Sequence, residues 1–146
     1  MDRKIYAVGL GPGDYEMMTL KAKRVLEEAD VIFLNGGKVF NGFEEVKKLL
    51  DNIGCGDKLT FIEMPEKNYR DNREEHIKYF VGETVKVFET GKKTAYVTMG
   101  DLSVYSSFPD VYEELKAYDI ELEAVAGIPS FLAPSALSGQ AIAEFR

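Results

Sequence analysis

The sequence has little of the residue types that build metal sites and disulfides. Its 146 residues include one cysteine, Cys55, and one histidine, His76. A single cysteine cannot form an internal disulfide, and these two side chains do not make a zinc-type ligand set. We therefore expect no metal centre built from protein ligands, with Cys55 as a loop thiol and His76 as an exposed helix residue.

Long apolar runs and an excess of basic residues are also missing. No uncharged apolar stretch approaches the roughly 20 residues of a membrane span, and glycines and a proline lie where a signal peptide has its apolar core. The formal charge is −7, with 18 Lys and Arg against 25 Asp and Glu, which disfavours binding to duplex nucleic acid. These features predict a cytoplasmic protein that binds neither nucleic acid nor membranes.

The residues that are present predict alternating strands and helices. Stretches rich in β-branched and aromatic residues predict strands at 4–11, 30–35, 58–65, 93–100 and 120–127. Three-and-four spacing of apolar residues predicts a helix capped by Thr19 and another from Asn72, where Glu75 completes a capping box, to Gly91. The inward side chains of this second helix are expected to be Ile77, Phe80, Val81, Thr84 and Phe88. A further helix is expected from about Pro109 to Ala117.

This alternation predicts an α/β fold, with an open, mainly parallel five-stranded sheet and helices on both faces. The segments that follow parallel strands emerge at one edge of the sheet, which is where open α/β proteins bind their ligands. In this sequence they are rich in glycine, proline, serine and asparagine, and they span residues 9–16, 34–40, 63–72, 100–107 and 127–135.

The glycines of GLGPGD, residues 9–14, follow the first strand, as they do in phosphate-binding loops. The dinucleotide fingerprint, however, is G-x-G-x-x-G opening directly into a helix, and Pro12 removes an amide donor here. The Gly-Lys-Ser/Thr motif for a nucleoside triphosphate is missing as well. The alternative to a binding loop is a tight turn that needs only the backbone freedom of glycine.

Three separated motifs, taken together, resemble those of the tetrapyrrole methylase family. They are VGLGPGDYEMMTLKAKRVLEEADVI (8–32), YVTMGDLSVYSS (96–107) and AGIPSFLAPSAL (126–137), and the likeness extends over essentially the whole chain. Enzymes of this family use S-adenosyl-L-methionine to methylate corrin precursors, uroporphyrinogen and diphthamide intermediates. The amino-acid sequences of the motifs TMGDLSVYSS and GIPSF are most similar to those of the enzymes of the cobalamin pathway that methylate C-20 of precorrin-2 or cobalt-factor-2.

The resemblance implies that S-adenosyl-L-methionine binds at the segments after the first, fourth and fifth strands. It places these residues at the cofactor or at the border of its pocket: Pro12, Met99, Gly100, Asp101, Val104, Pro129 and Ser130. The alternatives are structural, with Gly100 serving a turn and Asp101 and Ser130 serving as helix caps. No catalytic base is assigned, because Asn35 stands where the uroporphyrinogen branch has an aspartate at the end of strand two.

Methyl transfer from a sulfonium to a carbon nucleophile is an in-line displacement that needs no metal. Positioning and the exclusion of water are expected to supply most of the rate. The tetrapyrrole substrate would be a polycarboxylate, and the residues that could attract it are Lys38, Lys67, Arg70 and Arg73. The alternative is that these four are ordinary solvated surface charges.

Two features depart from the family pattern. Leu102 stands where a proline usually follows the Gly-Asp pair, and residues 126–129 read Ala-Gly-Ile-Pro where Pro-Gly-Ile/Val-Ser/Thr is usual. The resemblance also implies a second α/β domain, so we expect residues 1–126 to form an N-terminal domain and 127–146 a linker and the start of a further domain. Two hypotheses remain: the N-terminal part of a precorrin-2 C-20 methyltransferase that works as a homodimer, or a truncated relative without activity that serves as a binding or dimerisation module.

Overall fold

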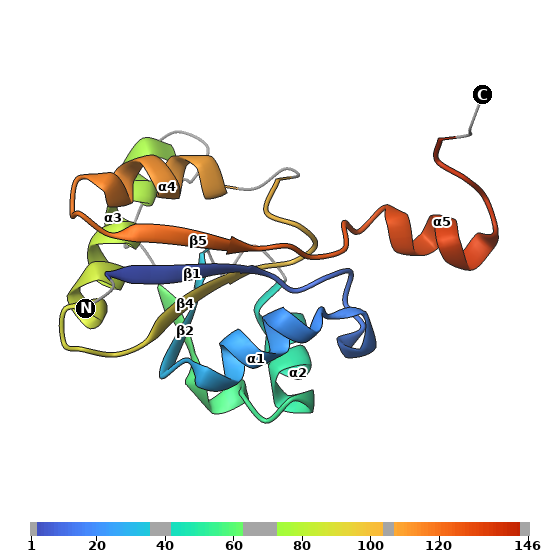
Figure 1. Cartoon of the computed structure of the whole chain (residues 1–146), viewed down its shortest axis with the longest axis horizontal. Coiled ribbons are helices and arrows are strands. Elements are labelled where there is room, and N and C mark those ends of the chain that lie inside the picture. The colour runs from blue at the N-terminus through green and yellow to red at the C-terminus, as the bar shows by residue number, and fades with distance from the viewer. Residues whose placement is uncertain (1–2, 36–41, 63–72, 104–106, 144–146) are drawn as a thin grey trace.

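Five parallel strands form a twisted sheet at the centre of the molecule (Figure 1). The computed structural model describes residues 3–35, 42–62, 73–103 and 107–143. The strands are β1 (Lys4–Gly9), β2 (Val31–Asn35), β3 (Leu59–Ile62), β4 (Thr94–Thr98) and β5 (Glu121–Val125). Their order in the sheet is β3-β2-β4-β1-β5, and every neighbouring pair is parallel. The predicted open, parallel five-stranded sheet is confirmed.

Three strands end two residues earlier than the sequence patterns predict. β1 ends at Gly9, β4 at Thr98 and β5 at Val125, where the patterns continue to residues 11, 100 and 127. The backbone explains two of these differences, because Gly11 has φ 84° and Gly100 has φ 72°. These angles lie in the left-handed region, which extended strands do not use. The residues after the strands therefore form bends.

Helices cover both faces of the sheet, as predicted (Figure 1). Helices α1 (Leu20–Glu28) and α2 (Gly42–Asn52) pack on one face, and α3 (Arg73–Phe88) and α4 (Phe108–Lys116) pack on the other. Two short 3-10 turns, η1 (Tyr15–Met17) and η2 (Gly56–Lys58), join these elements. The last helix, α5 (Leu132–Ser138), extends away from the sheet beyond the end of β5.

The predicted helix starts and faces are largely confirmed. Thr19 caps α1, since its hydroxyl oxygen accepts a hydrogen bond from the Ala22 amide at 3.1 Å. Of the side chains expected to face inward from α3, four are buried and Phe88 is partly buried. The predicted cap Asn72 lies outside the described residues. The structure also contains helix α2, which the sequence patterns do not predict.

The core consists of two layers, because successive strand residues point to opposite faces. Ala7, Phe33 and Tyr96 pack with α3 and α4, and the ring of Tyr96 meets that of Phe80 edge-on at 5.5 Å. Their chain neighbours Val8, Ile32 and Val97 pack with α1 and α2. The sheet is thus buried on both faces, as parallel sheets usually are.

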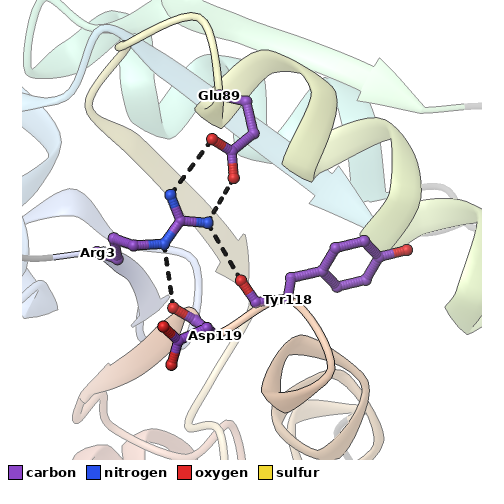
Figure 2. A network of polar contacts seen from close by, with 4 residues as sticks. All are labelled: Arg3, Glu89, Tyr118 and Asp119. Atoms are coloured by element: carbon purple, nitrogen blue, oxygen red, sulfur yellow. Dashed lines mark hydrogen bonds and ion pairs between the residues drawn. The ribbon is translucent and has the colours of Figure 1, made fainter.

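Arg3 joins three chain segments at the amino end of the sheet (Figure 2). Its guanidinium pairs with Glu89 at 2.5 Å, just after α3. It also donates to the carbonyls of Tyr118 at 3.1 Å and Asp119 at 3.2 Å, in the turn before β5. The ion pair lowers the pKa of Glu89, since it favours the carboxylate. These contacts join chain segments at the amino edge of the sheet, which lies opposite the carboxyl ends of the strands.

Candidate functional site

Three bends lie next to one another at the carboxyl edge of the sheet, since β4, β1 and β5 are neighbours. We call the bends at residues 9–13, 99–103 and 126–130 the carboxyl rim. Two of the five segments expected at this edge, residues 36–40 of one and 63–72 of the other, lie outside the described residues. The expectation that the bends meet at one edge holds for the three that the structure describes.

Backbone hydrogen bonds join the first two bends. The Leu10 amide donates to the carbonyl of Thr98 at 2.9 Å. Beyond it, Gly11 and Gly100 form an antiparallel bridge, with N–H to O=C distances of 3.1 and 2.7 Å in the two directions. Both backbone polar groups of Gly100 are therefore used within the protein, and its left-handed φ serves the turn.

The third bend packs against the first two through glycines. A Cβ placed on Gly9 would lie 2.7 Å from the Gly100 carbonyl oxygen and 3.0 Å from the Gly127 nitrogen. A Cβ on Gly127 would overlap the same oxygen and lie 2.8 Å from the carbonyl carbon and oxygen of Gly9. These distances are too short for a real side chain, so the three backbones touch only because Gly9 and Gly127 have none.

Asp101 uses its carboxylate to connect two of the bends. Oδ1 accepts a hydrogen bond from the Gly127 amide at 2.9 Å. Oδ2 accepts from the Ser103 amide at 3.0 Å and from the Ser103 hydroxyl. These donors, the Ser103 hydroxyl first and then the Gly127 amide, lower the pKa of Asp101, because they stabilise the charged form. Asp101 does not cap the next helix, whose N-cap is Ser107.

Two side chains hold the bend after β4 from opposite faces of the sheet. Leu102, which replaces the usual proline, is 4% exposed and belongs to the core layer under α3 and α4. Met99 is half-buried and packs with the layer under α1 and α2. Its methyl group would lie 3.8 Å from a Cβ on Gly13, a residue that is otherwise open to solvent. The bend is thus anchored on both sides.

The remaining predicted cofactor residues are Pro12, Pro129, Ser130 and Val104. Pro12 is half-buried beside Gly13, and Pro129 and Ser130 pass over Gly100, with the Ser130 nitrogen 3.6 Å from a Cβ placed there. Ser130 is exposed and does not cap α5, whose N-cap is Phe131 with no side-chain hydrogen bond. Val104 lies outside the described residues.

The structure adds Gly9, Ser103 and Gly127 to the rim residues that the sequence argument selects. Gly9 opens the predicted segment 9–16 and Gly127 closes the predicted strand 120–127, and these positions are the signal from which the two glycines could have been found. The contact of Ser103 with Asp101 has a sequence signal too, since an aspartate commonly binds the amide two residues later.

The basic residues considered for a polycarboxylate are only partly described. Arg73 starts α3 and pairs with Asp110 of α4 at 2.5 Å, so a local acid balances its charge. Lys38, Lys67 and Arg70 lie outside the described residues. A hollow of about 440 Å³ lies between α3 and α4, and Arg73 and Ile77 form part of its wall. The rest of its lining is acidic and consists of Glu74, Asp110, Glu113 and Glu114. This negative lining does not suit a polycarboxylate. A second hollow of about 210 Å³ lies near Lys4 and Thr94, at the amino end of the sheet.

Cys55 and His76 take no part in the rim. Cys55 is buried under α2, and burial raises the pKa of its thiol. His76 is half-buried on α3, where the sequence argument expects an exposed side chain. In the described ranges, no three His, Cys, Asp or Glu side chains gather to hold a metal ion. None of the helices in those ranges has the length and apolar character to cross a membrane.

The parallel sheet, the helices on both faces and the glycine-lined rim define an open α/β protein. The sequence model of one family, Tetrapyrrole (Corrin/Porphyrin) Methylases, matches residues 4–146. The chain therefore belongs to the tetrapyrrole methylase family, as the resemblance predicts.

Three relatives illustrate the range of functions within this likeness. The chain is 34% identical over 137 residues to a probable cobalt-precorrin-2 C(20)-methyltransferase of Methanocaldococcus jannaschii, covering 92% of this chain and 56% of the relative. It is 30% identical over 135 residues to a cobalt-precorrin-4 C(11)-methyltransferase of the same organism, covering 92% and 46%. It is 33% identical over 136 residues to a uroporphyrinogen-III C-methyltransferase of Priestia megaterium, covering 93% and 52%.

Solved structures agree on the fold. A cobalt precorrin-4 methyltransferase superposes with a TM-score of 0.74 at 22% identity, over 98% of this chain and 53% of that one. A uroporphyrin-III-C-methyltransferase from Thermus thermophilus gives 0.71 at 24% identity, over 99% and 56%. The chain thus spans about half the length of the relatives it matches.

Proposed function

We propose that the carboxyl rim binds S-adenosyl-L-methionine and that the protein acts as a methyltransferase on a tetrapyrrole precursor of cobalamin. The observation that carries the proposal is the convergence of three bends, through the Gly11–Gly100 bridge and the contacts of Gly127, at the edge where open α/β proteins bind ligands. Membership of the tetrapyrrole methylase family supports the same chemistry.

The rim residues suit a nucleoside ligand with an amino-acid tail. Glycines allow the backbone to approach a ligand closely, and Gly13 is exposed beside the methyl group of Met99. Pro12, Met99, Gly100, Pro129 and Ser130 are the described residues that we assign to this contact, with Asp101 beside them. When bound, the cofactor would supply a methyl group on a positively charged sulfur, and the task of the rim is to orient it and exclude water.

For the substrate we propose precorrin-2, methylated at C-20. The amino-acid sequence of residues 98–107 and 127–131 supports this choice, as does the 34% identity to a probable C(20)-methyltransferase. The relatives named for C(11) and for uroporphyrinogen III are nearly as similar, at 30% and 33%. A methyl-transfer assay with labelled S-adenosyl-L-methionine should therefore label precorrin-2 and leave uroporphyrinogen III unlabelled; the reverse pattern would refute this substrate.

A binding or dimerisation module is the second candidate, and α5 favours it. Helix α5 extends from the sheet and exposes large apolar side chains on itself and its flanks: Phe131, Leu132, Leu137 and Ile142. Under this proposal the apolar side chains of α5 pair two copies of the chain. The enzyme proposal also implies a homodimer, with residues 127–146 as a linker and the start of a further domain. Light scattering should then report twice the monomer mass, and a purely monomeric protein would contradict it.

Calorimetric titration with S-adenosylhomocysteine, which lacks the transferable methyl group, tests the binding proposal. We expect saturable binding with one ligand per chain. No detectable heat at millimolar ligand would contradict the proposal.

A further inference from the structure

The segment after β5 is held in place by a side chain from the bend after β4. The Oδ1 atom of Asp101 accepts the Gly127 amide hydrogen at 2.9 Å, across 26 positions of the chain. Close to it, the Leu132 amide donates to the Pro129 carbonyl, which is a local bond within the turn that leads into α5. Since α5 extends away from the sheet, the Asp101–Gly127 bond ties this segment to the body of the protein.

A shift of Gly127 cannot stay local. Its backbone touches those of Gly9 and Gly100 at distances that leave no room for a methyl group. Pro129 and Ser130 follow directly and pass over Gly100, with the Pro129 Cα 3.8 Å from a Cβ built on Gly100. The position of Gly127 therefore sets where Pro129 and Ser130 lie relative to Met99 and Gly100.

The carboxylate of Asp101 is occupied by protein donors. One oxygen holds Gly127, and the other accepts from the amide and hydroxyl of Ser103. A ligand group that bound this carboxylate would compete with these bonds, and hydrogen bonds to a charged group are the stronger ones in proteins. The geometry therefore favours a role inside the protein for this side chain.

We propose that Asp101 is a positioning residue, which acts by fixing Gly127 and thereby shapes the rim, and that its carboxylate makes no contact with the cofactor. This inference rests on the proposed function, because the segments that Asp101 aligns are those assigned to S-adenosyl-L-methionine. It differs from the expectation that the resemblance gives, in which Asp101 belongs to the residues that touch the cofactor.

Replacements at residue 101 separate the two roles. In Asp101→Asn, Oδ1 still accepts from Gly127 and Nδ2 can donate to the Ser103 hydroxyl, while only the local bond from the Ser103 amide is lost. Because the bond to Gly127 remains, affinity for S-adenosylhomocysteine should stay within roughly threefold of the wild type. Asp101→Ala removes the acceptor and should weaken binding roughly tenfold or more, as expected for a lost hydrogen bond to a charged group. The matched control Asp57→Ala removes an exposed carboxylate at the amino end of β3 and should leave affinity unchanged. Equal losses in Asp101→Asn and Asp101→Ala would overturn the inference.

A second readout needs no ligand and so distinguishes this inference from the proposed function. Hydrogen exchange of the Gly127 amide should be at least roughly tenfold faster in Asp101→Ala than in the wild type, while the Val97 amide in the centre of β4 is unchanged. If Asp101→Ala does not fold, the wild type alone gives the answer, since the proton resonance of the Gly127 amide should shift as Asp101 is protonated. An amide that is insensitive to both changes refutes the positioning role, whereas failure of the wild type to bind S-adenosylhomocysteine refutes only the proposed function.

Discussion

At the scale of single residues, the carboxyl rim depends on glycines, whose lack of a side chain lets backbone segments pack together. Gly9, Gly100 and Gly127 bring three backbone segments into contact, and any Cβ at Gly9 or Gly127 would meet main-chain atoms that cannot rotate away. Gly82, in the middle of α3, is different, because a Cβ there meets no atom within 4 Å. The same chemical change should therefore have opposite effects at these two kinds of glycine.

We predict that Gly127→Ala lowers the free energy of unfolding by about 1–3 kcal/mol, as overpacking usually does. Gly82→Ala should raise it by about 0.5–1 kcal/mol, because alanine loses less conformational freedom in a helix. Urea denaturation of the two variants measures both changes. A Gly127→Ala variant as stable as the wild type would show that the three backbones are not in tight contact.

Asp101 should also make stability depend on pH in the acid range. Its pKa is lowered in the folded state by Ser103, Gly127 and Leu102, so the unfolded chain binds the proton more readily. The contribution is complete above the unfolded pKa of about 4 and is lost as the pH falls toward the folded value. Unfolding free energies measured from pH 6 to pH 3 should fall less steeply for Asp101→Asn than for the wild type. Parallel curves would contradict this assignment.

Single residues were predictable where a chemical group itself defines the role. The sequence predicts Thr19 as a cap because its hydroxyl suits the start of a helix, and the structure confirms the cap through the hydrogen bond from the Ala22 amide. The partners of Asp101 were not predictable, because Gly127 follows 26 positions later and only the fold brings its amide to the carboxylate.

At the scale of elements, the bend after β4 is held by the core as well as by hydrogen bonds. Leu102 lies in the layer under α3 and α4, and Met99 packs with the opposite layer. The departure from the usual proline therefore gives this bend a buried side chain in place of a rigid ring. The substitution is compatible with the fold, and Leu102 anchors the bend in the core.

We predict that Leu102→Ala destabilises the protein by about 2–5 kcal/mol, the usual cost of truncating a buried leucine. Leu20→Ala is the matched control, because Leu20 is 87% exposed and its truncation should change stability by less than about 0.5 kcal/mol. Thermal and urea unfolding measure both. Equal effects of the two replacements would contradict the burial of Leu102.

The sequence predicted the elements better than their ends. Hydrophobic periodicity predicts the five strands and three of the helices, and their alternation predicts that the strands are parallel. The structure confirms these predictions. The sequence pattern extends β1 and β4 too far, because Leu10 and Met99 are apolar and continue the strand pattern, while Gly11 and Gly100 already turn the backbone.

At the scale of the whole molecule, the two ends of the sheet have different constructions. The carboxyl rim is built from backbone contacts between glycines, whereas the amino edge is joined by the side chain of Arg3 (Figure 2). Arg3 connects the start of β1, the end of α3 and the turn before β5, which are far apart in the sequence.

We predict that Arg3→Ala lowers the melting temperature more than Glu89→Gln does. The alanine variant loses the bonds to the Tyr118 and Asp119 carbonyls, whereas Glu89→Gln removes only a solvent-exposed ion pair. The effect of Glu89→Gln should also shrink at 1 M salt, where surface charges are screened. A larger effect of Glu89→Gln would show that the ion pair dominates this edge.

The central claim, that the carboxyl rim is the cofactor site, is tested most directly by mapping where S-adenosylhomocysteine binds. Glycine amides report both edges of the sheet, with Gly11, Gly13, Gly100 and Gly127 in the rim and Gly54 and Gly91 in turns near the amino edge. In a nitrogen–proton correlation spectrum, we predict that the ligand shifts the rim glycines and leaves Gly54 and Gly91 unchanged. Shifts confined to Gly54 and Gly91, or no shifts at saturating ligand, would contradict the claim.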